Sequence, residues 1–155
     1  MYDARQIANW FIQRAAAEGR RFTIMQLLKL IYIAHGWYLE MTGGAPLSRN
    51  KIEAWKHGPV IPDVYRVFRQ QGIDIAHADG SFPSQVDTYS ANVLDYVYRN
   101  YGNINAGRLS QMTHEPGGPW DTASRQFGFF APITNEMILP HYQAKRLQYQ
   151  SRQNG

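Results

Sequence analysis

Histidine and carboxylate side chains are the groups in this sequence that could perform acid–base or metal chemistry, because the chain contains five His and no Cys. His114 and Glu115 begin the zinc-protease pattern HExxH, but the fifth position is Gly118, so the second metal-ligating His is absent. No two His lie three to five residues apart, the spacing that places two ligands on one face of a helix. We therefore expect no metal site and no cofactor.

The motifs of nucleophilic and phosphate chemistry are also missing. The sequence has no GxSxG elbow to expose a nucleophilic Ser, no GxxxxGK[ST] phosphate loop and no GxGxxG dinucleotide loop. An acid–base site would have to combine side chains from two Gly-Pro-rich segments that are distant in sequence. The candidate side chains are Glu53, Glu115, Asp121, His57 and His114. Structural turns explain these segments more simply, so we expect no catalytic residues and no enzymatic activity.

Two segments place a large aromatic residue beside Gly-Pro and a His: AWKHGPVIPDVY at residues 54–65 and THEPGGPW at residues 113–120. Aromatic residues in rigid turns lose little entropy on binding and often carry interface hot spots. We expect Trp55 to anchor the core, whereas Trp120 suits the core and an interface equally. If the two segments form one exposed surface, its partner contacts are His57, Tyr65, His114 and Trp120.

The element that must position these segments is the stretch LLKLIYIAHGWYLEMTGG, residues 27–44. Its apolar residues cover most of the circumference of a helix, which predicts a helix at the centre of the domain. Lys29, His35 and Glu40 mark the strip that we expect to reach water. Thr23 is the expected N-cap, and a Gly at 43 or 44 is expected to end the helix in a left-handed conformation.

Shorter amphipathic segments surround this helix. Capping residues predict helix starts, with Asp3 for the first helix, Asp87 or Ser90 for the fourth and Asn105 for the next. The last helix is expected to start at Thr134 with a kink or a delayed start, because Pro140 lies inside it. We expect a short extended pair near residues 46–57, a loose loop at 72–87, and two core plugs in the loop before the last helix, Phe129 and Phe130.

The fold class that follows is mainly α: a compact single-domain helical fold of roughly six or seven helices, built on a buried central helix and completed by one short β-hairpin. Its 155 residues suffice for one domain, expected at 1–150 with a frayed C-terminal tail at 151–155. The N-terminus is not a secretory signal, and the central helix is too short and too polar in places to span a bilayer. We expect a cytoplasmic protein with no membrane partner.

The net charge of +4 is modest and scattered along the chain. Proteins that bind nucleic acid usually gather their basic residues on one face, so we do not expect a nucleic-acid partner. Attraction to an acidic protein partner is the simpler interpretation.

These motifs resemble a known family. The run LLKLIYIAHGWYLEMTGGAPLSRNKIEAWKHGPVIPDVYRVF, then a variable loop, then LSQMTHEPGGPW is similar to the Panacea antitoxin domain, also called SocA-like and long known from phage-associated proteins. The resemblance covers residues 7–142. It includes the spacing K-x-x-Y-x-A-x-G-W-Y in the central helix, formed by Lys29, Tyr32, Ala34, Gly36, Trp37 and Tyr38.

The resemblance implies an antitoxin of a toxin–antitoxin system that neutralises a cognate toxin, encoded by the adjacent gene, through direct protein–protein binding. The alternatives are a proteolytic adaptor that delivers a toxin to an ATP-dependent protease, a prophage-encoded hydrolase, and a nucleic-acid-associated regulator. If the chain is such an adaptor, the ATP-dependent protease is a second partner. The sequence leaves open whether the chain forms a homodimer. Family members often carry N-terminal DNA-binding segments; this chain begins almost directly with the domain, so we expect no transcriptional autoregulation by it.

Overall fold

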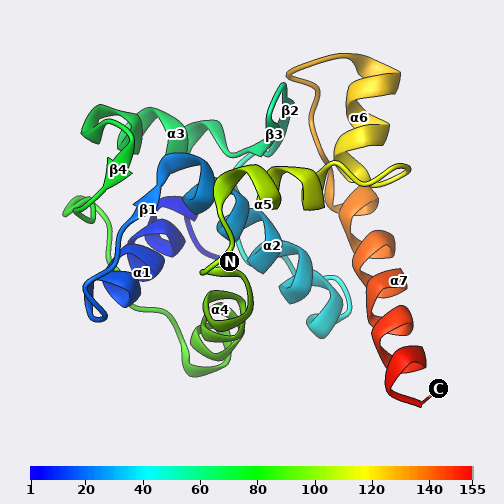
Figure 1. Ribbon diagram of the computed structural model, residues 1–155, viewed down its shortest axis with the longest axis horizontal. Coiled ribbons are helices and arrows are strands. Elements are labelled where there is room, and N and C mark those ends of the chain that lie inside the picture. The colour runs from blue at the N-terminus through cyan, green and yellow to red at the C-terminus, as the bar shows by residue number, and fades with distance from the viewer. Residues whose placement is uncertain (155) are drawn as a thin grey trace.

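The computed structural model describes residues 1–154, which form seven α-helices, one 3-10 turn and two small sheets (Figure 1). The helices are α1 (Ala4–Ala16), α2 (Ile24–Thr42), α3 (Pro62–Phe68), α4 (Thr88–Tyr101), α5 (Ala106–Thr113), α6 (Pro119–Phe127) and α7 (Asn135–Asn154). The strands are β1 (Phe22–Thr23), β2 (Glu53–Trp55), β3 (Gly58–Val60) and β4 (Asp74–Ile75), and the 3-10 turn is η1 (Arg69–Gln71). The predicted mainly-α, compact fold is confirmed.

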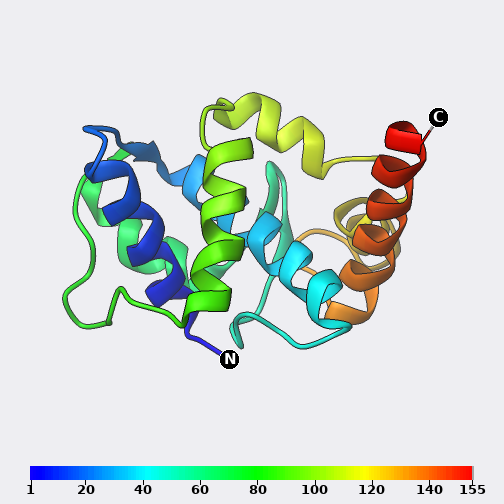
Figure 2. The same ribbon diagram turned by 90° about the horizontal axis from the view of Figure 1, so that it is seen from below.

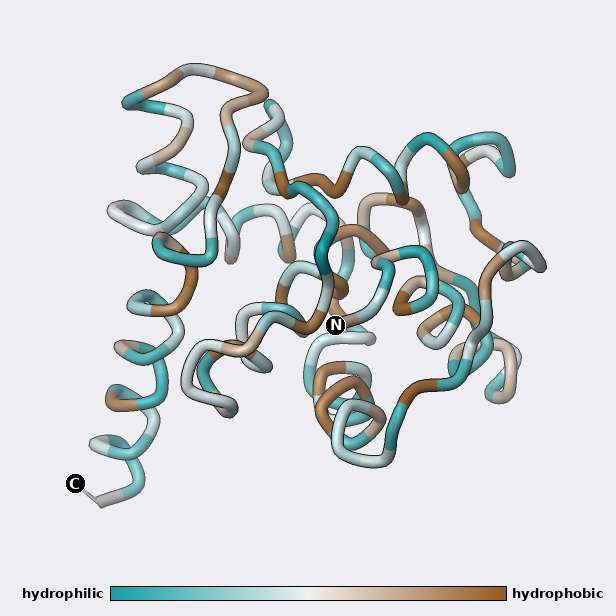
Figure 3. Tube along the Cα trace, turned by 180° about the vertical axis from the view of Figure 1, so that it is seen from behind, coloured by the Kyte–Doolittle hydropathy of each residue, from teal (hydrophilic) through white to brown (hydrophobic). Residues whose placement is uncertain are grey.

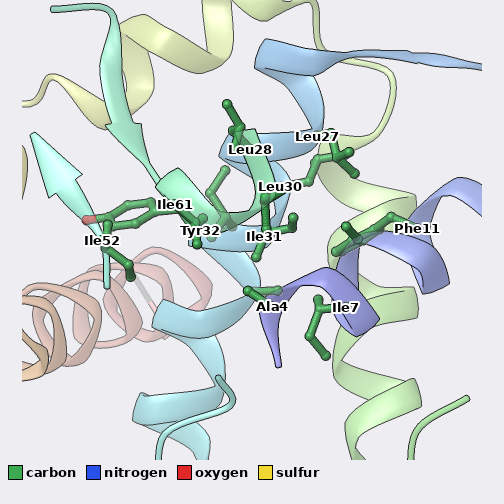
Figure 4. Close-up of a cluster of buried hydrophobic side chains, with 14 of the residues drawn as sticks. Ala4, Ile7, Phe11, Leu27, Leu28, Leu30, Ile31, Tyr32, Ile52 and Ile61 are labelled. Carbon is green, nitrogen blue, oxygen red and sulfur yellow. The ribbon is translucent and has the colours of Figure 1, made fainter. Parts of the chain in front are cut away.

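Helix α2 runs through the middle of the molecule, with α1, α3, α4, α5, α7 and strand β3 packed around it (Figures 1 and 2). Its apolar side chains meet those of α1 and of the hairpin region in one core (Figure 4). A capping box begins the helix, because the Thr23 side chain accepts from Gln26 N–H while the Gln26 side chain accepts from Thr23 N–H. Gly43 ends it in the left-handed conformation, as the sequence predicted.

The strip of α2 that was expected to reach water is instead covered. Lys29 is fully buried and His35 is 2% exposed, because β3 and α5 cover the first residue and the start of α7 covers the second. His35 donates from Nε2 to Asn135 Oδ1 at 2.8 Å and accepts at Nδ1 from Ser48 N–H. Glu40 is half-buried and pairs with Arg146 of α7. The prediction failed because the polar strip of a central helix is also in contact with neighbouring elements.

The expected hairpin is formed by β2 and β3, slightly further along the chain than residues 46–57. The strands are antiparallel, with Trp55 opposite Gly58. A third extended segment follows α6 and lies along the free edge of β2, where Ala54 N–H donates to Ala131 O and Phe130 N–H donates to Ala54 O. The sequence analysis missed the second sheet, in which β1 pairs with β4.

The loop of residues 72–87 is anchored to α1 rather than loose. Asn9, which is fully buried, donates from Nδ2 to Asp79 O at 2.9 Å and to Phe82 O at 3.1 Å, and its Oδ1 accepts from Asp79 N–H at 2.8 Å. Asp87 then caps α4 by accepting from Ser90 N–H, as predicted. Buried amide bonds of this kind hold a loop that its composition alone would describe as mobile.

Helix α7 starts at Asn135, directly after the predicted cap Thr134, whose carbonyl accepts from Ile138 N–H. The helix continues through Pro140, so of the two predicted alternatives the delayed start is wrong. Residues 151–154, expected to be a frayed tail, belong to this helix, and residue 155 lies outside the described part of the chain. No helix within residues 1–154 combines the length and the apolar character needed to cross a lipid bilayer.

Candidate protein-binding surface

The turn of the β2–β3 hairpin brings the two aromatic Gly-Pro segments together. Trp120 Nε1–H, from the first turn of α6, donates to Trp55 O at 2.7 Å. Ser110 Oγ–H, from α5, donates to His57 O at 2.7 Å. Residues that are more than fifty positions apart in sequence are thereby held on one part of the molecule.

His114 and Trp120 form a stacked pair next to this turn. Their ring centroids are 3.8 Å apart and the ring planes differ by 8°. The short distance follows from local structure, because His114 is the C-cap of α5 and Trp120 is the second residue of α6, only a short turn later. Burial, followed by the charge of Lys29, lowers the pKa of His114, so a neutral imidazole stacks on the indole.

Three aromatic side chains from three different elements form a row, which we call the aromatic row: Tyr65 of α3, Trp55 of β2 and Phe130 after α6. The ring centroids of Tyr65 and Trp55 are 5.0 Å apart, and those of Trp55 and Phe130 are 5.7 Å apart, both in edge-to-face geometry. Trp55 packs against the core, as predicted, but it is only half-buried, so part of its ring stays accessible. Edge-to-face pairs stabilise one another while leaving ring surface free for a partner.

The segment of residues 127–130, the Phe link, carries three exposed rings. Phe127, Phe129 and Phe130 are 65%, 56% and 64% exposed. The prediction that Phe129 and Phe130 plug the core is therefore wrong. The pairing of this segment with β2 turns Ala131 and Ile133 inward and leaves Phe130 outside. In Figure 3 the connection between α6 and α7 includes hydrophobic residues at an outer corner of the molecule.

The groups that could have formed an acid–base site are engaged in local contacts. Glu53 accepts from Trp55 Nε1–H at 2.9 Å. Asp121 accepts from Gly117 N–H at 2.8 Å, and Glu115 forms an ion pair with Lys145. Within residues 1–154 no group of three or more His, Asp or Glu side chains is arranged to hold a metal ion.

Lys29 lies beneath the hairpin turn. Its Nζ is buried and has no hydrogen-bond partner within residues 1–154. A Cβ placed on Gly58 would lie 2.6 Å from Lys29 Cε and 3.2 Å from Thr113 Oγ1, so this glycine leaves the room that the lysine occupies. Burial lowers the pKa of Lys29 to about 8.

The four residues predicted as partner contacts thus lie around one hairpin. The His114 ring stacks on Trp120. Tyr65 packs on Trp55, whose backbone carbonyl accepts from Trp120. His57 is exposed, and its backbone carbonyl accepts from Ser110 of α5. Sequence reasoning missed the Phe link. The sequence feature that could have revealed it is the run FGFFAP at the end of a predicted helix. A Gly that ends a helix, followed by a short loop bounded by Pro, usually lies on the surface.

Comparison with known proteins identifies the class. The family model of the antitoxin SocA-like Panacea domain matches residues 27–121, and the chain belongs to this family. One curated relative is the antitoxin SocA of Caulobacter vibrioides (strain NA1000 / CB15N), which is 35% identical over 132 residues that cover 77% of this chain and 69% of the relative. The search of solved structures found no significant match. Both the family and this relative are named as antitoxins.

Proposed function

We propose that this protein neutralises a cognate toxin by direct protein–protein binding, and that the toxin contacts the surface around the β2–β3 hairpin. Family membership supports the antitoxin role. The observation that carries the location is the Phe link, where three large apolar rings are exposed within four residues and adjoin the aromatic row. Contiguous exposed apolar patches mark interaction sites, whereas single exposed apolar residues do not.

The exposed rings are large enough to matter energetically. Each of the three Phe would remove roughly 120 Å² of apolar surface from water on binding, given a ring-bearing side chain of about 200 Å². At the usual coefficient the three together contribute a gross term of roughly 9 kcal/mol. This is comparable with the free-energy cost of association, so further contacts from His57, Tyr65, His114 and Trp120 would supply the net affinity.

The first test is a growth assay. The product of the adjacent gene is expressed alone and together with this chain, and the tagged chain is then purified to see whether the two co-elute. We expect the neighbour to arrest growth alone and to be harmless and bound in the presence of this chain. A neighbour that is harmless when expressed alone and forms no complex would refute the proposal.

A second test separates contact from degradation. Purified toxin and this chain are mixed without ATP or protease, and residual toxin activity is titrated against the ratio of the two proteins. Direct neutralisation predicts complete inhibition at a fixed stoichiometric ratio. Inhibition that appears only when an ATP-dependent protease is present would favour the adaptor alternative instead.

The surface itself is tested with the triple variant F127S/F129S/F130S. Leu147 is 66% exposed and lies on α7, so L147S is a matched control that also removes an exposed apolar side chain. We expect the triple variant to fold and to lose neutralisation, while the control retains it. Equal neutralisation by both variants would remove this surface from the proposal.

A further inference from the structure

The aromatic row ends at a free cation. Arg69 Cζ lies 5.7 Å from the ring centroid of Tyr65, so the guanidinium extends the row by one step. Lys56, at the hairpin turn next to Trp55, is exposed as well. Within the described residues neither cation makes an ion pair, whereas Arg66 of α3 and Arg125 of α6 are paired with Asp63 and Asp121.

One carboxylate, that of Glu53, also lies at the row, and within residues 1–154 it forms no ion pair with either cation. Glu53 is engaged by Trp55 Nε1–H, which places it against the indole. The surface therefore carries aromatic rings, two unpaired cations and one half-buried carboxylate, so its local charge is positive. An apolar patch with an excess of positive charge beside it is complementary to an apolar segment that also carries acidic residues.

The backbone at Phe130 supplies a second, independent observation. Its φ is 69°, which is a strained value for a bulky residue, and it is the one such non-glycine residue within residues 1–154. The strain is maintained by Phe130 N–H, which donates to Ala54 O at 2.8 Å. Glycine would adopt this conformation without strain, as Gly128 does two residues earlier at φ = 88°. Strained residues that persist in this way cluster at functional sites.

We propose that the aromatic row and the Phe link, together with Lys56 and Arg69, bind an acidic amphipathic segment of the toxin. This inference rests on the proposed function and adds the chemistry of the partner: apolar or aromatic side chains that pack on Trp55 and Phe130, bordered by Asp or Glu. A second copy of this chain fits less well, because its own surface would bring like charges together and the chain carries a net charge of +4.

The aromatic part is tested with F130G, measured against the purified toxin by calorimetry. Glycine removes the ring and relieves the backbone strain, so the thermal midpoint should stay equal or rise while the dissociation constant rises at least tenfold. Because stability and binding move in opposite directions, lost binding cannot be attributed to misfolding. L147S should change the dissociation constant by less than twofold.

The charged part is tested with the double variant K56E/R69E and the control R21E, which reverses an exposed charge beyond the end of α1. We expect the double variant to slow association at least tenfold at low salt and to flatten the salt dependence, and the control to do neither. Overlapping synthetic peptides of the toxin should include an acidic, aromatic-containing peptide that binds the native chain. Replacing the acidic residues of that peptide by Lys should restore its binding to K56E/R69E.

The outcomes separate the two proposals. A toxin that binds the native chain, F130G and K56E/R69E equally well overturns this inference and leaves the proposed function intact. A native chain that binds no toxin overturns both. A dimer in analytical ultracentrifugation that F130G abolishes would assign the surface to self-association and would also overturn the inference.

Discussion

Gly36 lies in the middle of α2 against the ring of Tyr142 of α7, and we expect the substitution G36A to destabilise the protein. An alanine Cβ at this position would lie 2.3 Å from Cε2 and 2.4 Å from Cζ of Tyr142. Carbon atoms in contact are about 3.5–4.0 Å apart, so the ring would have to move by more than about 1 Å. It has little room to do so, because Tyr142 is 4% exposed and the centroid of its ring lies 5.0 Å from that of Trp37.

The expected magnitude combines two opposing terms. Overpacking a core typically costs about 1–3 kcal/mol, and an overlap of this size belongs at the upper end. Alanine favours the helix over glycine by about 1 kcal/mol. The free energy of unfolding should therefore fall by about 2 kcal/mol, which corresponds to a loss of about 4–8 °C in Tm for a chain of this length.

The assay is chemical denaturation of G36A in two backgrounds. In the Y142A background the ring is absent, so only the helix term remains and G36A should stabilise by about 1 kcal/mol. The sign of the effect therefore reverses between backgrounds, with a coupling energy of about 3 kcal/mol. Stabilisation by G36A in the native background, or an equal loss in both backgrounds, would show that the ring does not pack on this glycine.

Three further substitutions test buried polar groups. K29M should raise the free energy of unfolding by about 1–3 kcal/mol at pH 7. This gain should shrink as pH rises from about 8 to 10.5, because the native chain itself becomes more stable there: its folded Lys29 is already neutral while the unfolded lysine still binds a proton. H35N should cost about 1–3 kcal/mol at pH 7. It should also flatten the loss of stability below about pH 6.5, because burial lowers the pKa of native His35 and the unfolded chain binds the proton first. N9A should cost about 2–3 kcal/mol and increase proteolysis within residues 76–87, measured by limited digestion, because the loop loses its buried anchor.

Local signals predicted most of the helices correctly. Asp3, Thr23, Asp87 and Asn105 each cap the helix that follows, because a capping bond joins residues only two or three positions apart. The apolar circumference of α2 likewise predicted its central position. The pairing of β1 with β4 left no trace in the sequence, since each strand has two residues and no periodicity develops over that length.

The candidate surface was predicted in part. The composition of the two Gly-Pro segments indicated His57, Tyr65, His114 and Trp120, and the structure places them around one hairpin. That composition did not reveal the Phe link, because phenylalanine in a loop suggests a core plug until the direction of the backbone is known. The pairing of residues 130–133 with β2 set that direction, and it depends on residues about eighty positions away.

The sequence by itself determined the mainly helical class, the boundaries of the central helix, the absence of known catalytic motifs and the resemblance to the family. These properties depend on residue types and short-range spacing, which the chain carries without folding. The tertiary structure alone decided that Lys29 and His35 are buried. It also decided that Tyr65, Trp55 and Phe130 form a row whose last ring belongs to the exposed Phe link. Exposure is set by what packs against a side chain, and here the neighbours come from elements that are distant in sequence.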